Sequence, residues 1–221
     1  MHQDISIRAL YDLSHTQAAA LLEQYEYPWE ALSQIGAFVK ALGEGLGEEY
    51  LNPKPEVYIH KTARVHPSAD ITGPCVIGPE TEIRPSAFIR GNALIGAGCV
   101  IGNSCEIKNA IIFDKSQVPH FNYVGDSILG FHAHMGAGAV TSNVKSDNSN
   151  VVVRCGDAAY ETGRRKVGAF LGDNTEIGCN SVLNPGAVIC RGARVYPLSC
   201  VRGTVPAGHI YKGNNNIIVI E

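Results

Sequence analysis

The reactive side chains of this sequence gather in one stretch, residues 119–143, which reads PHFNYVGDSILGFHAHMGAGAVTSN. The stretch contains His120, Tyr123 and Asn143, and Lys108 lies upstream of it. A neutral imidazole can accept a proton near pH 7, and an ammonium group attracts anionic ligands. These residue types indicate proton transfer beside a bound anion.

The chain on both sides of this stretch repeats every six residues. A branched aliphatic or aromatic residue stands at every sixth position from Ile59 to Phe113, and the pattern resumes from Leu171 to Val201. A small residue stands two positions before most of these anchors. A period of six fits neither an α-helix nor a long strand, so each hexad is interpreted as one short strand and a tight turn.

Three hexads make one triangular coil, in which the anchors point inward and stack at about the 4.8 Å strand spacing. The sequence therefore predicts an all-β solenoid of roughly six or seven coils that rises about 30 Å. Residues about 18 positions apart then stack on one face, so polar groups of adjacent coils can converge. Lys108 follows the anchor Ile107, and its side chain should point outward.

Residues 1–52 do not follow the hexads and contain two amphipathic helical patterns. One begins after Ser14 or Thr16, and the other begins at Pro28 and ends before Gly43. We expect this helical cap to cover the open N-terminal end of the solenoid, whose strand edges would otherwise be exposed. A module for partner docking or oligomer stabilisation is the alternative.

Residues 53–221 form the predicted solenoid domain, which a loop at 142–168 interrupts. Loops longer than about 12–15 residues are usually functional or disordered. This loop ends in the basic residues 164–166, and it could be a lid or an arm that reaches a neighbouring subunit. The hydrophobic tail 210–220 predicts a terminal strand.

The composition indicates a globular protein, with 45% hydrophobic residues and 24 glycines. A net charge of −3 gives no reason to expect a nucleic acid or an anionic membrane as a partner. No apolar run approaches the ~20 residues that span a bilayer, and the N-terminus lacks a secretory signal, so we expect a cytoplasmic protein. None of the seven cysteines lies in a CxxC pair, which favours free thiols.

Three segments carry a specific resemblance: GNSCEIKNA at 102–110, PHFNYVGDSILG at 119–130 and MGAGAVTSN at 135–143. They resemble the acetyltransferase domain of the bifunctional bacterial N-acetylglucosamine-1-phosphate uridyltransferase and glucosamine-1-phosphate acetyltransferase, over about residues 80–203. Archaeal sugar-1-phosphate nucleotidylyltransferases carry a similar domain. The resemblance implies a left-handed parallel β-helix, a homotrimer, acetyl-CoA as co-substrate and no metal for the transfer step. A nucleotidyltransferase domain has no room here, so we expect that half to be absent.

The resemblance also implies a role for each reactive residue. His120 matches the general base that takes a proton from the attacking amine. Lys108 and Tyr123 match groups that hold the sugar 1-phosphate, and Asn143 matches an asparagine that contacts the sugar. The backbone amide of Ala137 would polarise the thioester oxygen.

Three positions depart from the family pattern. Arg84 precedes a proline, as the phosphate-binding arginine of the family does, whereas counting back from Gly102 selects Arg90; we expect Arg90 to bind phosphate. His134 replaces an asparagine that contacts the substrate, which leaves the identity of the sugar open. Cys179 replaces a serine on the CoA side.

The sequence thus predicts an N-acetyltransferase of nucleotide-sugar and cell-envelope biosynthesis that acetylates an amino-sugar 1-phosphate. Two alternatives stay open. One is a module that binds a sugar phosphate without turnover, since His134 departs from the family pattern. The other is a metal-dependent enzyme similar to the β-helical carbonic anhydrases, in which His132 and His134 would join His120 around zinc.

Overall fold

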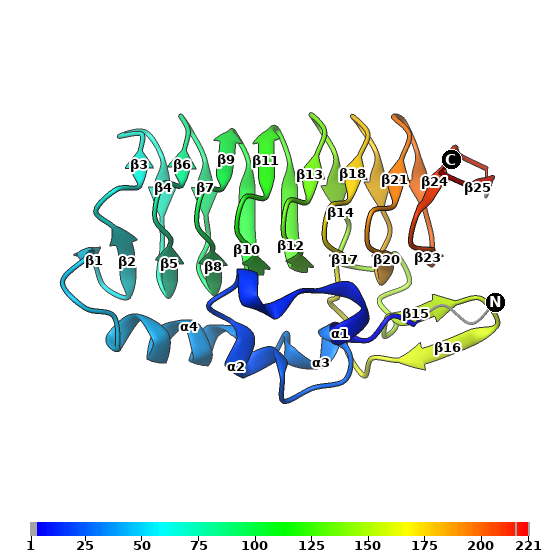
Figure 1. Cartoon of the computed structure of the whole chain (residues 1–221), viewed down its shortest axis with the longest axis horizontal. Coiled ribbons are helices and arrows are strands. Elements are labelled where there is room, and N and C mark those ends of the chain that lie inside the picture. Colours follow the sequence, from blue (N-terminus) through cyan, green and yellow to red (C-terminus); the bar gives the residue numbers. More distant parts are fainter. Residues whose placement is uncertain (1–3, 215, 221) are drawn as a thin grey trace.

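The computed structural model describes residues 4–214 and 216–220. Figure 1 shows a prism of stacked coils with a layer of helices along one side. Every contact between successive coils is a parallel strand pair, and antiparallel pairs are confined to the two ends of the prism and the insertion. The solenoid predicted from the six-residue period is confirmed, as a left-handed parallel β-helix.

The prism has three faces, which we name for what lies on them. The helix face consists of β2 (Val57–His60), β5 (Cys75–Ile77), β8 (Ala93–Ile95), the second halves of β10 (Glu106–Ile112) and β12 (Tyr123–Leu129), β17 (Ala169–Leu171), β20 (Ala187–Ile189) and β23 (Thr204–Val205). The histidine face consists of β3 (Arg64–Val65), β6 (Glu82–Ile83), β9 (Val100–Asn103), β11 (Gln117–His120), β13 (His134–Met135), β18 (Glu176–Ile177), β21 (Arg194–Val195) and β24 (His209–Tyr211). The tyrosine face consists of β4 (Asp70–Ile71), β7 (Phe88–Ile89), the first halves of β10 and β12, β14 (Val140–Thr141), β19 (Val182–Leu183) and β22 (Cys200–Val201).

The inward side chains form the core that the hexads predict. Ile77 pairs with Ile95, and Ile83 pairs with Ile101, one coil further on. Each is fully or almost fully buried, and burial of such a side chain stabilises the fold by about 1.5–3 kcal/mol. Eight strands stack on the helix face of the described chain, so the predicted six or seven coils were too few.

The prediction that Phe113 is an inward anchor is wrong. In the middle of the prism the register between coils steps by 17 residues and not 18, since Val100 pairs with Gln117 and Gln117 with His134. The lost residue moves the inward position to Ile112, which pairs with Ile95 and lies in the core. Phe113 packs outside the coil, against the helices.

The helices also lie elsewhere than predicted. Helix α4 (Ile35–Glu44) contacts β5, β8 and β10 along the side of the prism (Figure 1), and does not cover its open end. The other helices are α1 (Ile7–Leu10), the 3-10 helix η1 (Leu13–His15), α2 (Ala19–Leu22) and α3 (Pro28–Ala31). The predicted helix from Pro28 is thus two helices, α3 and α4.

The helices lie along the helix face because they form a second, outer core with it. The strands of this face point apolar side chains outward as well as inward, as in a sheet that is covered on both sides. The outward residues include Val76, Leu94 and Phe170, which are buried together with Trp29 and Leu32 of the helical segment. The three-residue apolar runs of these strands were the sequence signal for a covered side.

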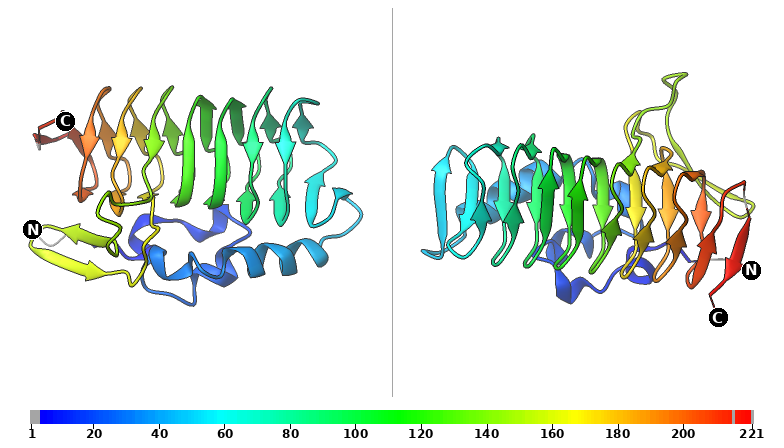
Figure 2. Two further views of the ribbon diagram at one scale, coloured as in Figure 1. Left: turned by 180° about the vertical axis from the view of Figure 1, so that it is seen from behind. Right: turned by 90° about the horizontal axis from the view of Figure 1, so that it is seen from above.

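The insertion at 142–168 folds back onto its own chain. It contains an antiparallel hairpin of β15 (Val152–Cys155) and β16 (Ala158–Glu161). Tyr160 of this hairpin packs against Tyr27 and Trp29, with ring centroids 5.0 and 5.7 Å apart. The left view of Figure 2 shows the hairpin beside the helical layer.

Antiparallel strands end the prism. At the first coil, β1 (Tyr50–Lys54) pairs with β2. At the last coil, β24 pairs with β25 (Ile217–Val219), so the single terminal strand predicted over 210–220 is a hairpin.

Candidate functional site

The outward residues at the end of the tyrosine face form a row that includes two of the predicted phosphate ligands. Ile89 pairs with Ile107, so Arg90 and Lys108, the next residues, lie one above the other in adjacent coils. Lys108 pairs in turn with Gly125. We call the row Arg90, Lys108, Gly125, Ser142, Asn184 and Arg202 the lysine row.

The structure separates the two candidate phosphate-binding arginines. Arg84 follows β6 on the histidine face, where its Nε lies 3.3 Å from Oε1 of Glu82. Arg90 lies beside Lys108, as the hexad count predicts, because only a whole number of coils brings two residues onto one row. Arg90, and not Arg84, therefore shares a row with Lys108.

Two cations of the lysine row, Arg90 and Lys108, already have carboxylate partners. Nη1 of Arg90 donates to Oε1 of Glu106 at 2.6 Å, and this hydrogen bond and charge raise the pKa of Arg90. Nζ of Lys108 lies 3.5 Å from Oδ2 of Asp126. Phosphate bound here must therefore share each cation with a carboxylate.

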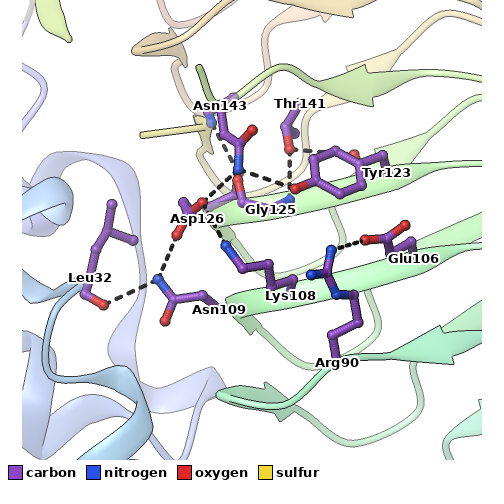
Figure 3. A network of polar contacts seen from close by, with 12 residues as sticks. Leu32, Arg90, Glu106, Lys108, Asn109, Tyr123, Gly125, Asp126, Thr141 and Asn143 are labelled. Atoms are coloured by element: carbon purple, nitrogen blue, oxygen red, sulfur yellow. Dashed lines mark hydrogen bonds and ion pairs between the residues drawn. The ribbon is translucent and has the colours of Figure 1, made fainter. Parts of the chain in front are cut away.

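Asp126 connects most of these groups (Figure 3). Asp126 is only 5% exposed. Besides its contact with Lys108, its carboxylate accepts hydrogen bonds from Nδ2 of Asn109 at 2.8 Å and from Nδ2 of Asn143 at 2.6 Å. It lies at the corner between two faces, with a positive φ of 50°. Asn109 also donates to the carbonyl of Leu32 at 3.3 Å, which ties the site to the helical layer.

We call Arg90, Glu106, Lys108, Asn109, Tyr123, Asp126 and Asn143 the polar cluster. Asp126 and Asn109 were not among the predicted site residues. The available signal was the Gly125–Asp126 pair close behind Tyr123, inside a segment that carries the resemblance. Aspartate and asparagine tolerate the left-handed backbone of such corners, which also made a purely structural role plausible.

The Tyr123 side chain reaches Asn143 because its ring lies along its own strand, beside Gly125. Its hydroxyl accepts from Nδ2 of Asn143 at 3.1 Å. A Cβ atom on Gly125 would lie 2.3 Å from that hydroxyl oxygen, so only glycine leaves room for this ring position. Burial and the nearby charge of Asp126 raise the pKa of Tyr123, so its phenol stays protonated and can donate to an anion.

His120 lies at the end of β11 on the histidine face, and the width of the tyrosine face separates it from Lys108 and Asp126. Its carbonyl accepts from the amide of Gly138 at 2.9 Å, and its backbone amide donates to Oδ1 of Asn122 at 3.0 Å. The residue is exposed, and within residues 4–214 and 216–220 its ring has no hydrogen-bond partner. The imidazole is therefore open to a ligand.

Two predicted residues of the CoA side share a row with His120. Gln117 pairs with His134 and His134 with Glu176, so His120, Ala137 and Cys179, each three residues further on, stack in successive coils. We call this the histidine row. Cys179 is an exposed free thiol.

His134 lies apart from the polar cluster. Its Nδ1 is 2.8 Å from Oε2 of Glu176, and both line a pocket of about 290 Å³ with His132, Lys115 and Gln117. His132 adopts a positive φ of 57° at a corner before β13, so His132 and His134 do not lie on one strand. The described part of the chain contains no group of three or more His, Cys, Asp or Glu residues that could hold a metal ion.

Comparisons with known proteins add relatives to this geometry. A family model described as the GMPPB C-terminal domain matches residues 71–157. The bifunctional sugar-1-phosphate nucleotidylyltransferase/acetyltransferase of Sulfurisphaera tokodaii is 36% identical over 105 residues, which are 48% of this chain and 26% of that protein. The bifunctional protein GlmU of Methanococcus maripaludis is 38% identical over 82 residues, which are 37% of this chain and 20% of that protein.

Among solved structures, the UDP-N-acetylglucosamine acyltransferase of Francisella novicida is 17% identical, with a TM-score of 0.41 over 71% of this chain and 67% of that chain. No helix of the described residues is long and apolar enough to cross a membrane. The chain spans only part of these relatives: the match covers 26% of the length of the Sulfurisphaera protein and 20% of the length of the Methanococcus protein. Over its coils, this chain is similar to the acetyltransferase part of the bifunctional sugar-1-phosphate nucleotidylyltransferase/acetyltransferases, which confirms the resemblance that its motifs indicated.

Proposed function

We propose that the protein is an N-acetyltransferase that transfers the acetyl group of acetyl-CoA to the amine of an amino-sugar 1-phosphate. One observation carries this proposal: an open imidazole, His120, and the polar cluster lie at the two edges of the tyrosine face. A sugar lying across this face can place its phosphate at one edge and point its amine toward the other. The Sulfurisphaera relative is an acetyltransferase by name, which supports the same reaction class.

In this proposal the polar cluster binds the acceptor. Lys108 and Arg90 give charge-assisted hydrogen bonds to the phosphate, and the protonated phenol of Tyr123 adds a neutral donor. The pairing of each cation with a carboxylate limits the net positive charge, so the donors act chiefly by geometry. Asn143 uses its amide nitrogen on Tyr123 and Asp126, which leaves its carbonyl oxygen to orient the sugar.

His120 acts as general base for the chemical step. The amine nitrogen attacks the thioester carbon while His120 accepts the proton that the nitrogen loses. The oxyanion of the tetrahedral intermediate meets the backbone amide of Ala137, one coil away on the histidine row. The intermediate then collapses, the C–S bond breaks, and the leaving thiolate takes the proton from the imidazolium of His120.

We further propose that the active form is a homotrimer located in the cytoplasm. The histidine row is open to solvent in the single chain, whereas acyl transfer benefits from exclusion of water. A second copy packed against this row would close the site. Sedimentation equilibrium of the full chain tests the assembly, and a monomer that turns over at full rate would contradict it.

A sugar-phosphate-binding module without turnover is the second candidate. One observation favours it: the polar cluster is complete within one chain, whereas the ring of His120 has no partner in the described residues. Such a protein would bind the ligand and leave acetyl-CoA intact.

The deciding experiment measures thiol release from acetyl-CoA with glucosamine 1-phosphate, galactosamine 1-phosphate and free glucosamine as acceptors. N-acetylglucosamine 1-phosphate is the matched control, because it keeps the phosphate but has no free amine. We expect release with at least one amino-sugar phosphate and none with the control. Binding of the phosphates by calorimetry without any thiol release would establish the second candidate instead.

A further inference from the structure

A second site lies on the lysine row, beyond the polar cluster. A cavity of about 540 Å³ opens between the insertion and the later coils, and we call it the hairpin pocket. Its lining includes Lys145 and Arg154 of the insertion and Asn184, Arg202 and Gly203 of the coils. Neither the predicted site nor the proposed reaction uses these residues.

The hairpin that forms one wall is fixed to the coils. Oγ1 of Thr204 donates to the carbonyl of Arg154 at 2.7 Å. Gly186 has a φ of 79°, and a Cβ atom there would lie 2.9 Å from Val151 of the insertion, so the two segments are in close contact. The pocket is therefore a formed feature with a fixed wall.

The charges of the pocket are unbalanced. Lys145 pairs with Asp147, 3.5 Å away. Arg154 and Arg202 have no ion-pair partner among residues 4–214 and 216–220. This differs from Arg90 and Lys108, each of which has a carboxylate partner. Two unpaired guanidinium groups beside one cavity are suited to a phosphate, which guanidinium binds in a bidentate way.

The register places this pocket relative to the proposed substrates. Val140 pairs with Val182, so Ser142 lies beside Asn184, and Asn184 lies beside Arg202 by the next pair. At about 4.8 Å per coil, Arg202 lies about 14 Å along the prism from Gly125. This is the acceptor's row; the histidine row, where acetyl-CoA is proposed to lie, runs along the other side of the face.

We propose that the hairpin pocket binds a phosphate ester or diphosphate group of a ligand that lies along the lysine row. One source is an acceptor that carries a nucleotide, that is, a nucleoside diphosphate amino sugar; its two phosphates share one oxygen, so its diphosphate would lie in this pocket and not on the polar cluster three coils away. The phosphate ester of CoA is the other source of the same chemistry. Only the link to an acceptor rests on the proposed function; anion binding by the pocket stands without it.

The test is calorimetric binding of UDP and of adenosine 3′,5′-bisphosphate, the phosphate-bearing end of CoA, to the full chain. The pocket variant is Arg154→Gln/Arg202→Gln, which keeps the backbone carbonyl that Thr204 binds. The control is Arg64→Gln/Arg194→Gln, which removes two exposed arginines from the histidine face. Loss of two charge-assisted contacts should weaken UDP binding about tenfold or more in the pocket variant and not in the control.

Each outcome decides the proposal. Weakened UDP binding in the pocket variant alone supports an acceptor with a nucleotide. Weakened binding of the bisphosphate alone supports a phosphate pocket whose source is CoA, and overturns the acceptor assignment. Equal binding to all three proteins, or equal weakening in both variants, overturns the pocket. The experiment measures binding and not turnover. Its result therefore stays valid even if the protein does not transfer acetyl groups.

Discussion

The two rows that flank the tyrosine face of the prism differ in how far a single chain completes them. On the lysine row, Lys108 and its neighbours Asp126 and Asn143 hold one another by hydrogen bonds and ion pairs. On the histidine row, His120 and Cys179 face solvent, and the described chain gives the His120 ring no partner.

The side chains proposed to bind the acceptor are held in place by one another, whereas the proposed general base is left free. A binding surface gains from side chains that are fixed before the ligand arrives, because less conformational freedom is lost on binding. A general base must instead keep its nitrogen free for the proton of the substrate. The tyrosine face separates these two requirements, with one row at each of its edges.

The largest test of this division is His120→Ala. Loss of a general base should lower the rate of acetyl transfer about 10²–10⁴-fold. The affinity for the sugar phosphate should stay unchanged, because the polar cluster does not include His120. Steady-state kinetics and calorimetry measure the two quantities, with His66→Ala as the control, an exposed histidine of the same face. A variant that loses affinity and keeps its rate would reverse the two roles.

The next test removes the centre of the cluster with Asp126→Ala. Asn109 and Asn143 then lose a buried acceptor, and an unsatisfied buried donor costs about 1–3 kcal/mol. We expect the free energy of unfolding in urea to fall by about 3 kcal/mol. Asp147→Ala, at an exposed carboxylate, is the control and should leave the free energy of unfolding nearly unchanged. Equal losses in both variants would show that Asp126 does not organise the cluster.

A smaller effect is expected from Gly125→Ala. The added methyl group occupies the space of the Tyr123 hydroxyl, so the ring must turn away from Asn143. The KM for the acceptor should rise about tenfold while kcat changes less, as for a lost ground-state contact. Gly47→Ala is the control, because a Cβ atom there meets nothing within 4 Å. A fall in kcat alone would place Tyr123 in the chemical step.

The mildest test reads the histidine row through its thiol. Burial raises the pKa values of Cys75, Cys99 and Cys190 to about 12, so at about pH 8 these thiols stay protonated and unreactive. We expect a disulfide reagent to modify only the exposed Cys179 and Cys200 in the native protein. Saturating CoA should slow the modification of Cys179 and leave Cys200 unchanged. Protection of Cys200 alone would move the donor to the tyrosine face.

The sequence by itself determined the solenoid and its inner core. A six-residue period leaves one inward side chain per short strand, and this local rule holds wherever the coil has 18 residues. It also supplied the reactive residues, since His120, Tyr123 and Lys108 could be singled out by type and spacing. The row shared by Arg90 and Lys108 followed from counting hexads.

Only the tertiary structure decided which side of the prism is covered. The helices could be read as an end cap because amphipathicity shows an apolar face and not its partner. The partner is set by the outward side chains of the helix face, such as Leu94 and Phe170. Likewise Phe113 leaves the inner core because the coil shortens by one residue, which depends on how neighbouring coils pair.

The polar cluster shows the same division. Asp126 and Asn109 adopt left-handed backbone at corners, where either residue is common for backbone reasons alone. Their place in a network appears only when the coils stack and bring Lys108 and Asn143, far apart in sequence, to one carboxylate. Sequence spacing determined the faces on which these residues lie, and three-dimensional stacking decided their partners, because hydrogen bonds depend on distances between coils that the chain order does not contain.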